Sequence, residues 1–245
     1  WQVSGGAFGQ GSGDVDANGQ DQGYGLTARF TAAPYLARDR VLHLGFGVSR
    51  RTPDAGVAGT ANRIRLRARP ETDVNQARFY STGRIANSEY EMLYNVEFAT
   101  VRGPASGQAE FTMAEVHCYG GRPTANFWSG YAFVSYFLTG ETRRYLPHEG
   151  EFDRIYPRSS RGAWEIAARY STIDLNDNSA GVGILGGRGN NYTLGLNWYV
   201  NPNLRFMANY VRVVTDGHSI PDQGTAPLIP GDKFNVMQVR ASLAL

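Results

Sequence analysis

"NYTLGLNWYVNPNLRFMANY", residues 191–210, alternates apolar and polar side chains on both sides of a short Asn-Pro-Asn turn. One face of each half is apolar: Tyr192, Leu194, Leu196 and Trp198, then Leu204, Phe206, Ala208 and Tyr210. Successive side chains of a strand point to opposite faces, so this stretch predicts two antiparallel strands joined by a tight turn.

The same alternation recurs along the chain in segments of about ten residues, and no long helical periodicity interrupts it. Gly, Pro, Asn and Asp separate the segments. We expect strands at 24–35, 41–51, 62–70, 76–85, 89–101, 109–120, 129–141, 162–175, 190–200, 203–215 and 234–245, with 1–4 as the end of another. The chain is therefore predicted to be all-β and antiparallel, with about 11–12 strands.

Two architectures hide an apolar strand face. A soluble sandwich turns it inward, whereas a transmembrane β-barrel turns it outward to lipid and keeps polar residues inside. Three features favour the barrel: strand length, Tyr and Trp near strand ends, and alternating connection lengths. The short connections are 35–40, 102–107 and 200–203, and the long ones are 5–23, 52–61, 176–190 and 216–233. The barrel prediction places short connections on the periplasmic side, provided that 76–85 is a strand.

Composition excludes several functions. The net charge of +2 argues against a nucleic-acid partner. Cys118 is the only cysteine, and the four histidines lack metal-ligand spacing, so no metal site and no cofactor are expected. No catalytic motif holds up, and the chain is not expected to be an enzyme. Trp1 is not an initiator, so the first residue looks like the interior of a longer precursor.

The arginines are placed unusually. Of 24 basic residues only Lys233 is lysine, which leaves 23 arginines. Within "NRIRLRARPE", residues 62–71, Arg63, Arg65, Arg67 and Arg69 alternate with Ile64, Leu66 and Ala68. We call these four cations the arginine row. Arginines on the lipid face would each cost about 2–4 kcal/mol near the midplane, so the row is predicted to face water inside the barrel, with its aliphatic neighbours touching lipid. A confined row of cations concentrates anions.

Other cations are weaker candidates for the same role. Arg84 lies on the next expected strand and Arg51 on the preceding one. The connection 142–161 is long although it falls on the periplasmic side, so it is expected to fold back toward the lumen. That would carry Arg154 and Arg158 toward the lumen.

Several motifs together resemble the phosphate-selective porins of the O/P family: "RIRLRARPE" (63–71), "FLTGE" (137–141), "GEFDRIYPRS" (150–159), "GAWEIAARYSTIDLND" (162–177) and "NNYTLGLNWYVNPNLRFMANY" (190–210). The resemblance spans nearly the whole chain. It implies a homotrimeric barrel of about sixteen strands in the bacterial outer membrane, of which 1–245 would be the C-terminal part of a single barrel domain. It also implies an arginine ladder at Arg63, Arg65, Arg67 and Arg69. Family members place lysines in the segment after "LTGE", whereas 143–161 has only arginines.

The favoured function is passive diffusion of anions, phosphate or other oxyanions, through an arginine-lined lumen. The expected partners are small anions, outer-membrane lipid and lipopolysaccharide. Two alternatives stay open. One is a structural or interaction barrel with an occluded lumen, and the other is a soluble carbohydrate-binding β-sandwich.

Overall fold

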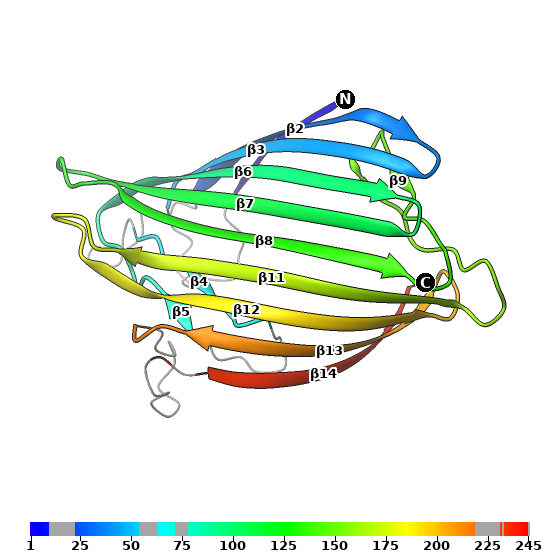
Figure 1. The fold of residues 1–245 in the computed structure, drawn as a ribbon. Helices are drawn as coiled ribbons and strands as arrows, with labels where there is room; N and C mark the ends of the chain where they lie inside the picture. Colours follow the sequence, from blue (N-terminus) through cyan, green and yellow to red (C-terminus); the bar gives the residue numbers. More distant parts are fainter. Residues whose placement is uncertain (10–22, 54–62, 72–77, 219–230, 232, 245) are drawn as a thin grey trace.

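The structure is a computed structural model that describes residues 1–9, 23–53, 63–71, 78–218, 231 and 233–244 (Figure 1). Ten antiparallel strands form one sheet in the order β1-β2-β3-β6-β7-β8-β11-β12-β13-β14. Their bounds are β1 Gln2–Gly9, β2 Tyr24–Ala37, β3 Arg40–Arg51, β6 Ser88–Arg102, β7 Ala105–Cys118, β8 Ala125–Phe137, β11 Ala163–Asp177, β12 Ile184–Tyr199, β13 Leu204–Thr215 and β14 Lys233–Leu243. The predicted all-β antiparallel fold is confirmed.

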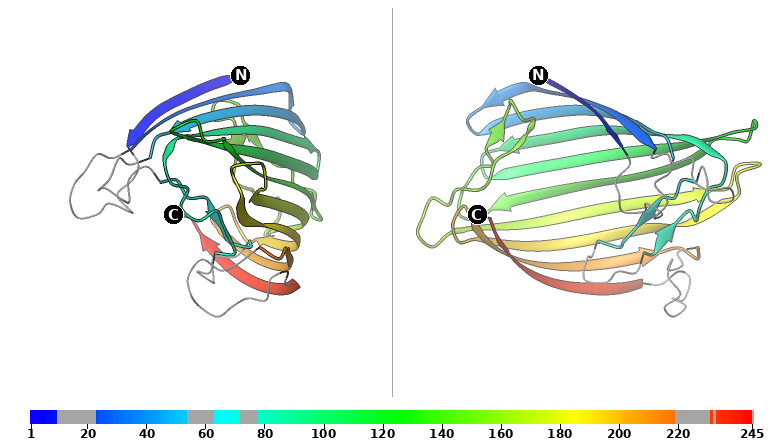
Figure 2. Two further views of the ribbon diagram at one scale, coloured as in Figure 1. Left: turned by 90° about the vertical axis from the view of Figure 1, so that its left-hand side faces the viewer. Right: turned by 180° about the vertical axis from the view of Figure 1, so that it is seen from behind.

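The sheet curls into a trough. Viewed along the strands, it opens on one side between β1 and β14 (Figure 2). These two strands are the edges of the sheet, and among the described residues they do not pair with each other. The described residues also contain no helix, and hence none long and apolar enough to cross a membrane.

The convex face of the trough is apolar. Leu26 on β2 is 51% exposed, Leu194 on β12 is 63% exposed, and Val239 on β14 is 83% exposed. Thr31, on the opposite face of β2 from Leu26, is only 2% exposed. A sandwich would bury these aliphatic side chains between two sheets. Their exposure is typical of a lipid-facing barrel wall and excludes the soluble sandwich.

Two predicted wall strands are wrong. Residues 62–70 and 76–85 do not join the ten-stranded sheet. Their described parts, 63–71 and 78–85, form an inner ribbon that lies within the trough (Figure 2). It contains β4 (Arg67–Ala68) paired with β5 (Tyr80–Ser81), and a single bridge joins Ile64 to Ile85. Asn62 and residues 76–77 lie outside the described residues. Each wall strand reverses the direction of the chain, so removing one strand would move the following turns to the other end of the sheet. Because both strands are absent from the wall, the short turns still lie at one end.

The apolar side of the inner ribbon packs against the wall. Ile64, Phe79, Tyr80 and Ile85 form a buried cluster with Ala114 and Val116 of β7, Ala125 and Phe127 of β8, and Leu175 of β11. The Phe79 ring also lies 5.3 Å from the ring of Phe234 on β14. Burying an aliphatic or aromatic side chain contributes about 1.5–3 kcal/mol. The aliphatic neighbours of the arginine row thus contact the inner wall, which corrects the prediction that they touch lipid.

Connection lengths differ between the two ends of the sheet. The predicted short turns are confirmed: residues 38–39, 103–104 and 200–203 all join strands at one end. The long connection expected at 176–190 is wrong, because β11 and β12 extend through most of it and leave only 178–183. Similarly, 5–9 belongs to β1. Most of 10–23, 52–61 and 216–233 lies outside the described residues.

One long connection lies at the short-turn end. Residues 138–162, the inner connection, return over the inner face with a small ribbon of β9 (Tyr145–Leu146) and β10 (Glu151–Phe152). Tyr145 packs against Val41 and Val101, and its hydroxyl lies 2.6 Å from Nδ1 of His43. Arg29 on β2 donates to the carbonyl oxygen of Gly150 at 3.2 Å. The wall therefore holds the inner connection through both apolar and polar contacts.

Candidate anion-conducting interior

The arginine row faces away from the wall. Ile64 is buried in the apolar cluster, while Arg63 and Arg67 are exposed and Arg65 and Arg69 are half-buried. Alternation along an extended segment sends the arginines to the opposite side from Ile64 and Leu66. That side is the interior of the trough, because the ribbon is docked on the inner wall. The row therefore lies on the side of the inner ribbon that faces away from β7, β8 and β11.

A fifth arginine joins the row, and sequence reasoning missed it. Arg78 lies near the start of the expected strand 76–85, where arginines do not alternate with apolar residues. Burial lowers the pKa of the Arg78 guanidinium below its ordinary value, and the nearby positive charges of the row add to this effect. The contributing members of the row are Arg65, Arg67 and Arg69. The ribbon thus brings together cations from both of its segments. Arg78 could have been found only from the register in which the two segments of the ribbon pair, and the pattern of one segment does not contain that register.

Glu71 ties the end of the row to two parts of the wall. Its carboxylate Oε1 accepts hydrogen bonds from Ser171 Oγ at 2.5 Å and from Arg169 Nη2 at 3.3 Å, both on β11. Its carbonyl oxygen accepts a hydrogen bond from Gln238 Nε2 on β14 at 2.9 Å. Glu71 also has a φ of +54°, which is uncommon for a residue other than glycine. The tether explains why the chain turns at this point.

The wall opposite the row carries a polar and aromatic network. The guanidinium of Arg169 lies 4.1 Å from the ring centroid of Tyr131. The Tyr131 hydroxyl donates to the carboxylate of Glu110 and accepts from Gln108 Nε2 at 2.9 Å. A cavity of about 300 Å³ is lined by Tyr131, Glu110 and Arg169 of this network together with Arg69. Arg69 and Arg169 therefore line the same space.

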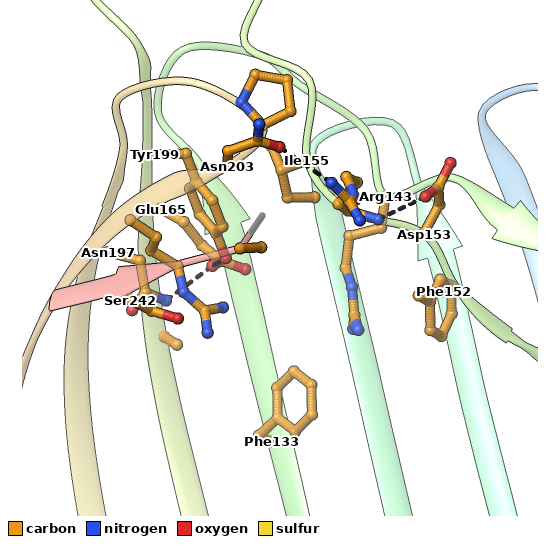
Figure 3. A pocket seen from close by; sticks show the side chains of 15 residues that line it. Phe133, Arg143, Phe152, Asp153, Ile155, Glu165, Asn197, Tyr199, Asn203 and Ser242 are labelled. Carbon is orange, nitrogen blue, oxygen red and sulfur yellow. Dashed lines mark hydrogen bonds between the residues drawn. The ribbon is translucent and has the colours of Figure 1, made fainter. Parts of the chain in front are cut away.

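Further cavities continue along the inner face. A cavity of about 230 Å³ shares Arg169 and Glu71 with the first, and shares Phe133 and Asn197 with a third of about 490 Å³. The third lies at the short-turn end, between the inner connection and β8, β11, β12 and β14 (Figure 3). Shared lining residues show that the three cavities are neighbours along the inner face, from Arg69 to the short-turn end.

The third cavity is lined by three cations, Arg143, Arg154 and Arg205, and by two carboxylates, Asp153 and Glu165. Glu165 accepts hydrogen bonds from Asn197 Nδ2 and from the Tyr199 hydroxyl, each at 2.8 Å. Burial lowers the pKa of the Arg143 guanidinium, while the charge of Glu165 opposes that change. Sequence reasoning did not single out Arg143 or Arg205 as site residues.

The remaining predicted site residues are scattered. Arg51 ends β3 on the inner face, and its guanidinium lies 5.9 Å from the Phe8 ring. Arg84 is exposed on the inner ribbon next to Ile85. Arg154 lines the third cavity and donates to Asn203 Oδ1 at 3.0 Å. Arg158 is exposed, and its backbone amide donates to the Glu141 carboxylate. The structure therefore brings Arg154 to a cavity but leaves Arg158 at the rim.

An apolar outer face and a polar inner face are typical of the wall of an outer-membrane β-barrel of the porin class. The comparisons agree, because the family model "Phosphate-selective porin O and P" matches residues 1–245, and the chain belongs to this family. Its members are channels of the outer membrane, so the chain is not an enzyme. An uncharacterized protein of Caulobacter vibrioides is 33% identical over 99% of the chain and 48% of its own length. Porin O of Pseudomonas aeruginosa is 29% identical over 83% of the chain and 50% of its own length. The chain spans about half the length of the curated relatives that it matches.

Proposed function

We propose that this protein forms a diffusion channel that prefers anions, phosphate or other oxyanions, and that the arginine row is its selectivity element. The observation that carries the proposal is the orientation of the inner ribbon. Its apolar side is buried against β7, β8 and β11, so the guanidinium groups project into the interior. A one-sign row inside a low-dielectric wall raises the local concentration of counter-ions.

The row is suited to oxyanions in particular. Guanidinium is a planar fork of donors that matches phosphate and carboxylate oxygens, and it keeps its charge when partly buried. Side chains two residues apart in an extended segment are about 6.6–6.8 Å apart, so one anion can contact neighbouring members of the row in turn. Arg169, which lines the same cavity as Arg69 and also the next cavity, extends the series toward the short-turn end. Arg84 and Arg51 would contribute at the other end.

The channel that we propose is larger than this chain. Unpaired strand edges inside a membrane are costly because lipid offers no hydrogen-bond partners. We therefore propose that the ten strands, as one domain over 1–245, are the C-terminal part of a closed barrel of about sixteen strands. A homotrimer in contact with outer-membrane lipid and lipopolysaccharide, as the family resemblance implies, is part of this proposal.

The test is a salt-gradient measurement on the full-length protein in a planar lipid bilayer. A reversal potential of the sign for anion permeation is expected. A reversal potential of the opposite sign would contradict the role of the arginine row.

A second candidate function has a specific observation in its favour. Two segments, the inner ribbon and the inner connection, lie within the trough and fill part of the space that a lumen would occupy (Figure 2). An occluded barrel with a structural role is therefore the alternative. Absence of any conductance from correctly assembled protein, judged by heat-modifiable migration, would favour it.

A further inference from the structure

The third cavity combines a cation with aromatic rings in a way that the arginine row does not. The Arg143 guanidinium carbon lies 4.1 Å from the ring centroid of Phe152 and 5.6 Å from that of Phe133. Figure 3 shows the Arg143 side chain reaching from the inner connection toward Phe133, with Phe152 to one side. Stacking on a ring holds a guanidinium by its face and leaves the donors on its edge available.

One of the Arg143 donors indicates a ligand. Nη1 of Arg143 is buried and has no hydrogen-bond partner among the described residues. An unsatisfied buried donor costs about 1–3 kcal/mol, so it marks a position where an acceptor is needed. The carboxylates of the cavity are already engaged: Glu165 by Asn197 and Tyr199, and Asp153 by the backbone amide of Arg154 at 2.8 Å.

The rest of the lining is partly apolar. Phe133, Phe152 and Ile155 border the cavity together with Ala167 and Ala244. Its volume of about 490 Å³ lies within the range of sites for small organic ligands, about 300–1,000 Å³. Orthophosphate has no apolar part to place against this lining. A second cation, Arg205, whose guanidinium lies 5.6 Å from the Tyr199 ring, also lines the cavity.

We propose that this cavity is a binding site for organic anions with an aromatic or apolar body, phosphate monoesters above all, and that Phe133 and Phe152 determine this preference. The anionic group pairs with the edge of Arg143, and the apolar body lies along Phe133, Phe152 and Ile155. This inference rests on the proposed function, because it assumes that anions travel along the inner face to this end of the channel.

The experiment compares two probes, phenyl phosphate and orthophosphate, as blockers of chloride current through the full-length protein in planar bilayers. Aromatic and cation–π contacts of this kind are worth about threefold to tenfold in affinity. Phenyl phosphate should therefore reach half-block at a concentration about threefold to tenfold below that of orthophosphate. It should block more strongly when added from the short-turn side.

The variant Phe152→Leu should bring the two half-blocking concentrations together, since it removes the ring and keeps an apolar side chain. The matched control is Phe46→Leu, because Phe46 lies on the outer face and is 46% exposed there. That variant should keep the wild-type gap. If Phe152→Leu does not assemble, Phe133→Leu tests the same preference, because Phe133 lines the cavity from β8 of the wall. Equilibrium dialysis of 4-nitrophenyl phosphate against the detergent-solubilised protein gives a readout that does not need conductance.

The possible failures are distinguishable. An anion-selective channel that both probes block equally overturns this inference and leaves the proposed function standing. Equal binding of 4-nitrophenyl phosphate and orthophosphate in dialysis does the same. A cation-selective reversal potential overturns the proposed function and this inference together.

Discussion

Replacing Arg65 and Arg67 by glutamine removes two central charges of the arginine row. A monovalent anion about 7 Å from a guanidinium gains about 0.6 kcal/mol in water-like surroundings, and about four times that at an effective dielectric constant of 20. Losing two such interactions costs at least about 1.2 kcal/mol, or about an eightfold drop in local anion enrichment. The dielectric constant of 20 would make the loss larger, so eightfold is the low end of the expected effect.

The assay is the reversal potential under a tenfold KCl gradient, where ideal selectivity for a monovalent ion gives about 59 mV. The double variant should move the potential toward zero by on the order of 20–30 mV. Folding should survive, because the apolar cluster that docks the inner ribbon is unchanged. Repulsion among the cations around Arg78 also decreases.

The control is Arg50→Gln. Arg50 pairs with Leu26 and Met92 in the sheet, and Leu26 is exposed on the outer face, so Arg50 lies outside the lumen. Its guanidinium lies 4.3 Å from the ring centroid of Tyr90. The Arg50 variant should retain the wild-type potential. An unchanged potential in the double variant, or an equal shift in the Arg50 variant, would refute the assignment of selectivity to the row.

Three other substitutions test how the interior is held. Gly189→Ala on β12 should displace the inner ribbon and increase current noise, because the new methyl group would overlap the Tyr80 ring. Glu71→Ala should have a similar effect on noise at higher temperature, since the carboxylate's hydrogen bonds to Ser171 and Arg169 are lost while the apolar cluster remains. Glu141 is 3% exposed; burial alone would raise its pKa, but hydrogen bonds from the Thr139 hydroxyl and the Arg158 amide outweigh burial and lower it. A lowered native pKa means that stabilisation is present above the ordinary carboxyl pKa and is lost as pH falls through the native value. Glu141→Gln should therefore reduce the temperature of heat-modifiable migration at neutral pH, with a smaller difference from wild type in acid; equal differences at both pH values would contradict this.

Much of the wall could be predicted because period-2 alternation is a local property. Nine of the expected segments correspond to β2, β3, β6, β7, β8 and β11–β14, and residues 2–4 of the expected segment 1–4 belong to β1. The exposure of Leu194 and Val239 agrees with the outward apolar face that alternation and aromatic placement predicted. The short turns were also readable, because Asn, Pro and Gly mark tight connections.

What alternation does not encode is the medium that covers an apolar face. Ile64, Leu66 and Ala68 have the pattern of a lipid-facing strand, yet they pack on the inner wall of the same protein. Hydrocarbon tails and the side chains of Val116 and Phe127 are equally good partners for an aliphatic residue, so sequence periodicity cannot distinguish them. Sequence reasoning thus placed the arginines on an aqueous side and misplaced their segment.

The sequence by itself determined an antiparallel wall with one apolar face and its turns, and it predicted a row of cations on an aqueous side. Only the tertiary structure decided that the row lies on a ribbon inside the trough, that Arg78 joins it, and that Phe133 and Phe152 flank Arg143. The physical reason is the distance along the chain between the residues that interact. Side-chain alternation depends on neighbouring residues, whereas these contacts join segments that are distant in the chain and form only when the wall curves.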